Sequence, residues 1–348
     1  MNPKQRVMAI LRGKENLRVP FTIYETKSFL RDEWKNLIDR ELLPVRRVNS
    51  YAIHRPNVKV THVPYTDENG RSLIKIIYET PGGVLSSVIE PAGFTSWRHE
   101  YMFKTPDDYK ALASMIKDSV VTSNYDNAAN AVKDAGERII VRDGMPYEPM
   151  QAIISEYMGT ERFCYEWMDN RDEVLKIYDL AVEMNRQTYQ FVADGPMEFA
   201  NYGGNVAPRI IGAENFVKYY APHYNEAAEV LHGKGKLIGT HMDDFVAPIM
   251  RELADTDLDY IEAYDPGMSP TIAEAKKYFG KMTIWCNWPS GKQLEPVESK
   301  IEYTKQMLGE AEPGGFIIGI TEDVPENIAY SHYSCILDAI EQYYGKSG

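Results

Sequence analysis

Four short apolar runs near the C-terminal end of this 348-residue chain constrain its fold most strongly. Each run ends in side chains that can bind a metal ion. The runs are LIGTHMDD (237–244), LDYIEAYDP (258–266), KMTIWCNWPS (281–290) and GGFIIGITED (314–323). If they are parallel strands of one (β/α)8 barrel, their carboxyl ends share the rim on which the active sites of such barrels lie. The pattern therefore predicts a barrel with a functional site at these strand ends.

The rest of the chain supports the same α/β fold. Strand-like segments also occur at 18–25, 137–144 and 197–205, and helix-like segments separate the strands from about residue 119 onward. This alternation indicates a parallel sheet. The first strand-like segment is not followed by GxGxxG, which favours a (β/α)8 TIM barrel over a dinucleotide-binding fold. Because no Pro/Ser/Gly-rich linker divides the chain, we expect a single barrel domain over residues 1–348.

Two segments near the N-terminus stand apart from this alternation. Residues 57–101 contain three strand-like stretches separated by the turn signals DENGRS and PGG, which predicts a meander of antiparallel strands. We expect this β-rich insertion to be an N-terminal elaboration of the barrel. Residues 28–43 have apolar side chains at helical spacing, so they are predicted to form a helix.

Charge and composition exclude several classes of partner. The chain has 38 basic and 51 acidic residues and a net charge of −13, which disfavours a nucleic-acid-binding face. It has no apolar run of about 18 residues, so no membrane span is expected. The N-terminus lacks a signal-peptide pattern, and the three cysteines are widely spaced. We therefore expect a cytoplasmic protein that acts on a small molecule.

Three strand-end side chains, His241, Glu262 and Cys286, form the predicted metal site. Consecutive members are one β/α unit apart, as successive strands of a barrel would place them. Zn²⁺ accepts nitrogen, oxygen and sulfur ligands, and three protein ligands leave a fourth position for substrate. Asp243 is predicted to replace one ligand or to orient His241, and Glu322 to bind the metal or to donate a proton. The alternative for each residue is a buried packing or hydrogen-bonding role.

Further polar and aromatic side chains near strand ends are candidates for binding a substrate. Some flank the glycine pair at 203–204, where a tight turn is the alternative explanation, and others lie beside the predicted ligands. The candidates are Asn201, Tyr202, Asn205, Tyr264, Trp285, Trp288 and, after the strand at 137–144, Glu148.

Two phrases of the sequence resemble those of a known superfamily. RVMAILRGKENLRVPF (6–21) resembles the opening of uroporphyrinogen decarboxylase-like proteins, and GITEDVPENIAY (319–330) resembles their ending. The order of elements between them fits, so the resemblance covers nearly the whole chain. True uroporphyrinogen decarboxylases carry an arginine-rich stretch after the first strand for the carboxylates of the substrate. Residues 24–35, YETKSFLRDEWK, contain no such stretch, which counts against tetrapyrrole decarboxylation.

The other branch of the superfamily comprises zinc-dependent methyltransferases that move methyl groups to or from a corrinoid cofactor. Their motif is His-x-Cys with a further Cys on a later strand. Here the corresponding residues are His241-Met242-Asp243, with Glu322 near the last strand and Cys286 on the strand before it. A rearranged ligand set of this kind is similar to the methyltransferase component of O-demethylases. The resemblance thus implies transfer of a methyl group from a methyl ether or related donor to the cobalt of cobalamin.

The resemblance also implies a partner and leaves several functions open. The chain has no cobalamin-binding DxHxxG pattern, so the corrinoid is expected on a separate partner protein, and members of the superfamily often form homodimers. One alternative is a cofactor-free decarboxylase that uses Arg142 and Arg209 to hold a carboxylate. The others are a methylcobamide:thiol methyltransferase and a binding protein without enzymatic activity, because fold alone does not establish function.

Overall fold

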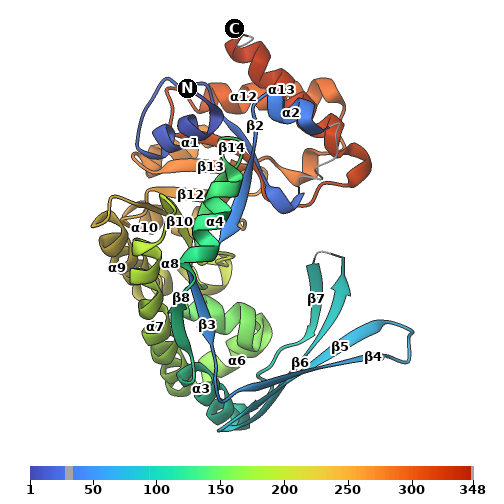
Figure 1. Cartoon of the computed structure of the whole chain (residues 1–348), viewed down its shortest axis with the longest axis vertical. Helices are drawn as coiled ribbons and strands as arrows, with labels where there is room; N and C mark the ends of the chain where they lie inside the picture. Colours follow the sequence, from blue (N-terminus) through green and yellow to red (C-terminus); the bar gives the residue numbers. More distant parts are fainter. Residues whose placement is uncertain (28–33, 94, 346–348) are drawn as a thin grey trace. The chain divides into compact units, whose positions relative to one another are not determined.

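The computed structural model describes residues 1–27, 34–93 and 95–345 and contains a closed barrel of eight parallel strands (Figure 1). The chain forms two compact units. The barrel unit comprises residues 1–50, 125–145 and 192–348, and the smaller unit comprises residues 51–124 and 146–191. The predicted (β/α)8 TIM barrel is therefore confirmed.

The barrel is closed because its first strand is hydrogen bonded to both the second strand and the last strand. Around the barrel the order is β1-β14-β13-β12-β11-β10-β9-β2, and every pair is parallel. The strands are β1 (Phe21–Tyr24), β2 (Leu42–Val48), β9 (Ile140–Gly144), β10 (Phe199–Tyr202), β11 (Leu237–His241), β12 (Tyr260–Tyr264), β13 (Thr283–Asn287) and β14 (Phe316–Ile320).

Strand β2 corrects one prediction. The helix expected over residues 28–43 is observed only as the short α2 (Lys35–Asp39), and residues 28–33 lie outside the described part of the chain. The backbone then enters β2 at Leu42, where hydrogen bonds to β1 and β9 fix it as a barrel strand. Tertiary pairing therefore overrides the helical spacing of the apolar side chains.

Helices cover the outside of the barrel and one closes its amino end. The helices of this unit are α1 (Pro3–Leu11), α2, α4 (Tyr125–Ala135), α8 (Pro208–Tyr219), α9 (Ala221–His232), α10 (Met250–Ala254), α11 (Ile272–Phe279), α12 (Val297–Glu310) and α13 (Glu326–Tyr344). Helix α1 starts with Pro3 and a capping box between Asn2 and Gln5, which satisfies free backbone N–H groups. Its Val7, Ile10 and Leu11 belong to the same buried cluster as barrel side chains such as Trp285.

Gly239 makes room for the aromatic ring of Tyr260 in the barrel. A Cβ atom at this position would lie 2.4 Å from the ring of Tyr260, so only glycine allows the ring to pack there. The Tyr260 hydroxyl lies 2.8 Å from Ala200 O and 2.5 Å from Asn201 Oδ1 and shares its one proton between these two acceptors. This contact fixes the orientation of the Asn201 side chain inside the barrel.

The smaller unit contains the predicted meander. A four-stranded antiparallel sheet runs β4 (Lys59–Thr66), β5 (Ser72–Thr80), β6 (Gly83–Ala92) and β7 (Thr95–Glu100), drawn in blue to cyan in Figure 1. The strands β3 (Tyr51–His54) and β8 (Val120–Ser123) form a separate antiparallel pair. The helices are α3 (Tyr109–Lys117), α5 (Pro149–Ala152), the π-helix η4 (Ile153–Met158), α6 (Thr160–Asp169) and α7 (Arg171–Asp194), whose end belongs to the barrel unit.

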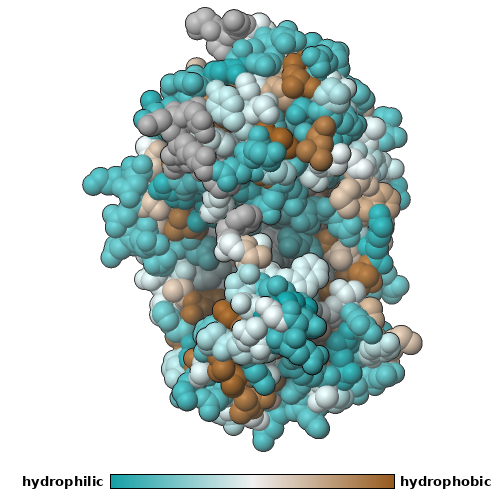
Figure 2. Space-filling model, turned by 90° about the vertical axis from the view of Figure 1, so that its right-hand side faces the viewer, coloured by the Kyte–Doolittle hydropathy of each residue, from teal (hydrophilic) through white to brown (hydrophobic). Residues whose placement is uncertain are grey.

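The surface is polar over most of the face shown in Figure 2, where the brown apolar areas are small and separate. Within the described residues, no helix is long and apolar enough to cross a membrane. The exposed apolar side chains are spread over several elements, among them β4, α6 and α8, and exposed apolar side chains are ordinary for a protein surface. Met168 and Leu294 are the most exposed of them, at 82% and 81%.

His332 gives the barrel unit a predicted sensitivity to acid. Its ring is fully buried on α13, packs edge-on against Trp288 at 4.7 Å, and has no hydrogen-bond partner at either nitrogen among the described residues. Burial, and secondarily the charge of Lys300, lower the pKa of His332 from 6.5 to about 3. The neutral ring therefore stabilises the fold fully above pH 6.5, and this contribution is lost as the pH falls toward 3.

We expect His332→Phe to reduce this acid sensitivity, because phenylalanine keeps the contact with Trp288 and cannot be protonated. From 1.36 kcal/mol per pH unit, the wild type should lose roughly 2 kcal/mol more than the variant between pH 6.5 and about 4.5. Urea unfolding of both proteins across this range measures the difference. Parallel pH profiles would contradict the prediction, whatever the absolute stability of the variant.

Candidate functional site

Five side chains from five strands meet inside the carboxyl half of the barrel around one oxygen of Glu262. They come from β1, β9, β10, β11 and β12, and we call them the Glu262 cluster. Glu262 Oε2 lies 2.8 Å from Tyr24 OH, 2.9 Å from an Arg142 terminal nitrogen, 2.7 Å from Asn201 Nδ2 and 3.0 Å from His241 Nδ1. Because side chains alternate along a strand, each strand contributes a residue from its inward face.

The cluster contains a buried ion pair. Glu262 is fully buried and Arg142 is 5% exposed. Burial alone would favour the neutral carboxyl group, but the charge of Arg142 and the hydrogen bond from His241 outweigh it and lower the pKa of Glu262 to about 2. Such a pair is tolerated in the interior because its hydrogen bonds offset the loss of hydration. Glu262 is therefore a carboxylate at neutral pH.

Two atoms of the ion pair remain without a partner. Glu262 Oε1 and Arg142 Nε are buried and form no hydrogen bond with any described residue. A buried polar atom without a partner is costly, and functional sites are a common place for such atoms. Glu262 Oε1 therefore keeps an unused acceptor, and Arg142 Nε keeps an unused donor.

His241 connects the cluster to the rim of the barrel. Its Nε2 lies 3.4 Å from Asp243 Oδ2, while its Nδ1 faces Glu262 and lies 3.1 Å from the Tyr24 hydroxyl. Burial disfavours the charged ring, but the hydrogen bonds to Asp243 and Glu262 outweigh it and raise the pKa of His241 to about 9. At neutral pH His241 is an imidazolium held between two carboxylates, which is the state of a proton donor.

Glu322 lies at the same rim, near Asp243 and His241. Burial, and secondarily the charge of Asp243, raise the pKa of the half-buried Glu322. The pKa of Asp243 is lowered, because the hydrogen bond from His241 outweighs its partial burial. Neighbouring acids with pKa values pushed in opposite directions are typical of sites that transfer protons.

The backbone is irregular directly after Glu262. Ala263 has φ +63°, a left-handed conformation that is rare for residues with a Cβ, and the pairing of β12 with β13 shifts by one residue between Glu262 and Tyr264. A β-bulge at this point changes the face to which the following side chains point. The bulge leaves Glu262 facing into the barrel and turns Tyr264 toward the helices.

The predicted metal ligand Cys286 does not join His241 and Glu262. It follows the inward-facing Trp285 on β13, is fully buried, and lies near Tyr264 and Tyr303 on the helical side. Burial, and secondarily the charge of Asp265, raise the pKa of the Cys286 thiol well above its usual range. Metal binding by cysteine requires the thiolate, which this environment disfavours.

The described residues therefore do not fit the predicted zinc site. No group of three or more His, Cys, Asp or Glu side chains within residues 1–27, 34–93 and 95–345 is arranged so that it could hold a metal ion. The one Glu262 oxygen that faces the imidazole is already surrounded by donors, among them a guanidinium.

The other predicted site residues lie in different parts of the structure. Asn201 is part of the Glu262 cluster, and Trp285 is in the buried interior of the barrel, with its indole N–H donating to Thr22 Oγ1 at 2.8 Å. Asn205 is exposed, and its backbone N–H donates to His241 O at 3.0 Å. Glu148 is buried in the smaller unit.

Tyr202, Tyr264 and Trp288 point toward the helices instead of the barrel interior. Tyr202 packs on Tyr224, and the Tyr264 hydroxyl donates to Pro270 O at 2.5 Å. The Trp288 indole N–H donates to Thr304 Oγ1 at 3.0 Å. Their observed contacts are those of packing residues.

Sequence analysis did not identify two members of the barrel mouth, Tyr24 and Arg47. Tyr24 ends β1, and Arg47 lies on β2, with its guanidinium carbon 4.4 Å from the centre of the Tyr24 ring. Arg142 was considered only for the decarboxylase alternative, together with Arg209, which lies over the ring of Phe245. Tyr24 could have been identified from the sequence, because it lies at the end of a strand-like run.

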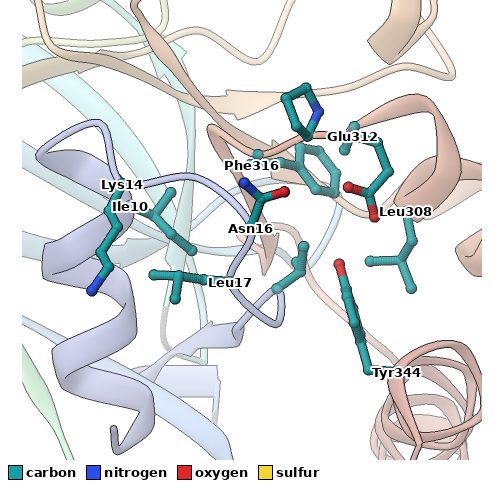
Figure 3. A pocket seen from close by; sticks show the side chains of 12 residues that line it. Ile10, Lys14, Asn16, Leu17, Leu308, Glu312, Phe316 and Tyr344 are labelled. Carbon is teal, nitrogen blue, oxygen red and sulfur yellow. The ribbon is translucent and has the colours of Figure 1, made fainter.

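A cavity of about 230 Å³ lies at the opposite, amino end of the strands (Figure 3). Its lining includes Ile10 of α1, Phe316 at the start of β14 and Tyr344 at the end of α13. Figure 3 shows Asn16 among these side chains and Lys14 pointing away from Tyr344. Because chemistry in (β/α)8 barrels occurs at the carboxyl end of the strands, this cavity is not the candidate active site.

Comparison with known proteins identifies the architecture. No family model and no curated protein matches the sequence. The structure is similar to that of a methyltransferase from Methanosarcina mazei, with a TM-score of 0.62 and 10% identity over 99% of this chain and 100% of that one. At this identity the similarity shows the fold.

Two further solved structures are similar with lower TM-scores. The tandem GH20 catalytic modules of a pneumococcal exo-β-D-N-acetylglucosaminidase have a TM-score of 0.40 at 12% identity, covering 94% of this chain and 86% of that one. A sugar phosphate isomerase/epimerase from Parabacteroides distasonis has a TM-score of 0.35 at 12% identity, covering 95% and 96%.

Proposed function

We propose that this chain is a methyltransferase that moves a methyl group from a small methylated donor, such as a methyl ether, to a corrinoid carried by a partner protein. The observation that carries the proposal is His241, a charged imidazole held between Glu262 and Asp243 at the mouth of the barrel. The full-length similarity to a protein named as a methyltransferase supports it.

The chemical problem in such a reaction is the leaving group. An alkoxide or phenoxide leaves poorly unless its developing negative charge is neutralised, and a positioned acid does this by donating a proton. His241 is charged at neutral pH, and its Nε2 faces the rim beside Asp243. Asp243 and Glu262 hold the ring in place, as the orienting carboxylate does for the histidine of a hydrolase triad.

The transfer balances with the residues of this chain as proton donors. The bond between oxygen and the methyl carbon breaks, the oxygen receives the proton of His241 Nε2, and His241 is left neutral until it takes a proton from solvent. A reduced corrinoid supplies the electron pair that forms the new bond to the methyl carbon. The raised pKa of Glu322 makes this residue a second source of the proton.

A cofactor-free decarboxylase is the second candidate. The observation that favours it is the arginine pair Arg47 and Arg142 at the barrel mouth, next to a charged histidine that could protonate a carbon after loss of CO₂. This reaction would need neither zinc nor a corrinoid.

One experiment separates the two candidates. Purified protein is mixed with cob(I)alamin and methyl-labelled phenyl methyl ethers, with and without added zinc, and methylcobalamin is followed by its absorbance. We expect enzyme-dependent methylcobalamin formation and release of the free phenol. Release of CO₂ from a carboxylated compound without any methyl transfer would favour the decarboxylase and overturn the proposal.

A further inference from the structure

Arg47 is a cation at the barrel mouth without a carboxylate partner. It is exposed, and it forms no ion pair with any of the described acidic side chains. Its guanidinium lies over one side of the Tyr24 ring at 4.4 Å, while His241 stacks near the same ring at a centroid distance of 6.5 Å. Tyr24 therefore contacts both the proposed proton donor and an unpaired guanidinium.

The neighbouring strand places a second arginine beside the first. Arg47 of β2 pairs in register with Arg142 of β9, and the Arg142 guanidinium also lies near the Tyr24 ring, at 5.8 Å. Like charges directly opposite each other on adjacent strands destabilise a sheet. Glu262 neutralises only Arg142, so the pair keeps one uncompensated positive charge.

Several other arginines of the barrel unit are paired with carboxylates. The adjacent Arg46 faces the other side of β2 and binds both oxygens of Glu25, at 2.7 and 2.6 Å. Arg6 likewise binds both oxygens of Glu41, in a bidentate ion pair at 3.1 and 2.7 Å. An unpaired guanidinium at the open end of the barrel therefore differs from the structural arginines nearby.

We propose that Arg47 binds a carboxylate of the substrate, so that the molecule whose methyl group is transferred is a small carboxylic acid. The planar guanidinium matches a carboxylate with two parallel hydrogen bonds. One uncompensated positive charge suits a monoanion better than a phosphate dianion. The inference rests on the proposed function for the identity of the reacting group, but the carboxylate site itself does not.

The placement gives Arg47 a positioning role. A carboxylate on Arg47 holds one end of the substrate beside the Tyr24 ring, and the opposite end then reaches toward His241. This separation of a fixed anchor from the reacting end makes the length of the substrate a determinant of specificity.

The test uses binding of a matched pair of probes and requires no turnover. Calorimetry compares 4-methoxybenzoate with the neutral 4-methylanisole, which has the same ring and methyl ether. We expect the wild type to bind 4-methoxybenzoate at least about tenfold more tightly, and Arg47→Met to weaken this binding by about 10- to 100-fold. The affinity for 4-methylanisole should not change, and Arg47→Lys should recover part of the loss.

Two controls make the result specific. Arg12→Met removes an exposed arginine that pairs with Glu198 on the surface, and it should leave both affinities unchanged. Inorganic phosphate tests the alternative anion. Equal binding of the two ethers by the wild type, tighter binding of phosphate, or full affinity in Arg47→Met would each overturn the carboxylate site. Arg47-dependent binding without methyl transfer to cobalamin would instead contradict only the proposed function.

Discussion

Replacing Glu262 by glutamine is expected to destabilise the barrel unit by about 3–5 kcal/mol, the usual cost of removing one partner of a buried ion pair. Glutamine has nearly the same shape, so the loss would be electrostatic. Arg142 would remain buried with no carboxylate beside it, and His241 would lose one of its two acceptors. The same change should lower the pKa of His241, because Glu262 is one of the groups that raise it.

Urea unfolding measures the first effect, and NMR titration of the histidine ring measures the second. Glu198→Gln is the matched control, because Glu198 forms an ion pair with Arg12 in which both side chains are more than half exposed. Exposed pairs contribute little to stability, so this variant should unfold close to the wild type. A Glu262→Gln protein as stable as the control would contradict the view that Glu262 is an ionised partner of Arg142.

A double variant tests the cause of the destabilisation. In Glu262→Gln with Arg142→Met, no buried charge is left without a partner. If the uncompensated guanidinium is the main cost, the double variant should be more stable than Glu262→Gln alone. Additive losses would instead indicate that the two residues stabilise the barrel independently.

The contact between His241 and Glu262 was predictable because it depends on barrel geometry alone. Both residues lie near the carboxyl ends of adjacent parallel strands, and the pairing of β11 with β12 sets them directly opposite each other. Apolar runs with a single polar residue near the end are enough to indicate such a rim. The prediction of a shared rim therefore needed no knowledge of side-chain orientation.

Side-chain orientation is the reason that Cys286 was misplaced among the predicted ligands. Strands of a parallel barrel are buried on both faces, so their sequences are apolar throughout and do not reveal which residues face inward. In TIWCN the inward residue is Trp285, and Cys286 faces the helices. In β12 the bulge at Ala263 further changes the alternation, and no sequence signal marks it.

Strand β2 could not be predicted for a different reason. Its sequence, LLPVRRV, contains a proline and two arginines and follows a segment with helical spacing. Only pairing with β1 and β9 makes it a strand, and this pairing places Arg46 outside and Arg47 at the barrel mouth. Arg47, on which the inferred carboxylate site depends, lies in this segment and for that reason was not identified from the sequence.

Replacing His241 by glutamine is expected to lower the rate of methyl transfer by about 10²- to 10⁴-fold, the contribution of a well-placed general acid. Glutamine can still form hydrogen bonds with Glu262 and Asp243, but it cannot give up a proton. The wild-type rate should fall as the pH rises through about 9, where the imidazolium loses its proton. In the variant this alkaline limb should be absent.

Two further variants test this assignment: Asp243→Asn alters the pKa of His241, and His232→Gln is the control. Asp243 is one of the groups that raise the pKa of His241, so Asp243→Asn should move the alkaline limb to lower pH. His232 also pairs with a carboxylate, Asp259 at 2.9 Å, but it lies on the outer helix α9 and should tolerate glutamine without loss of rate. An unchanged alkaline limb in His241→Gln would assign the proton to a group other than His241.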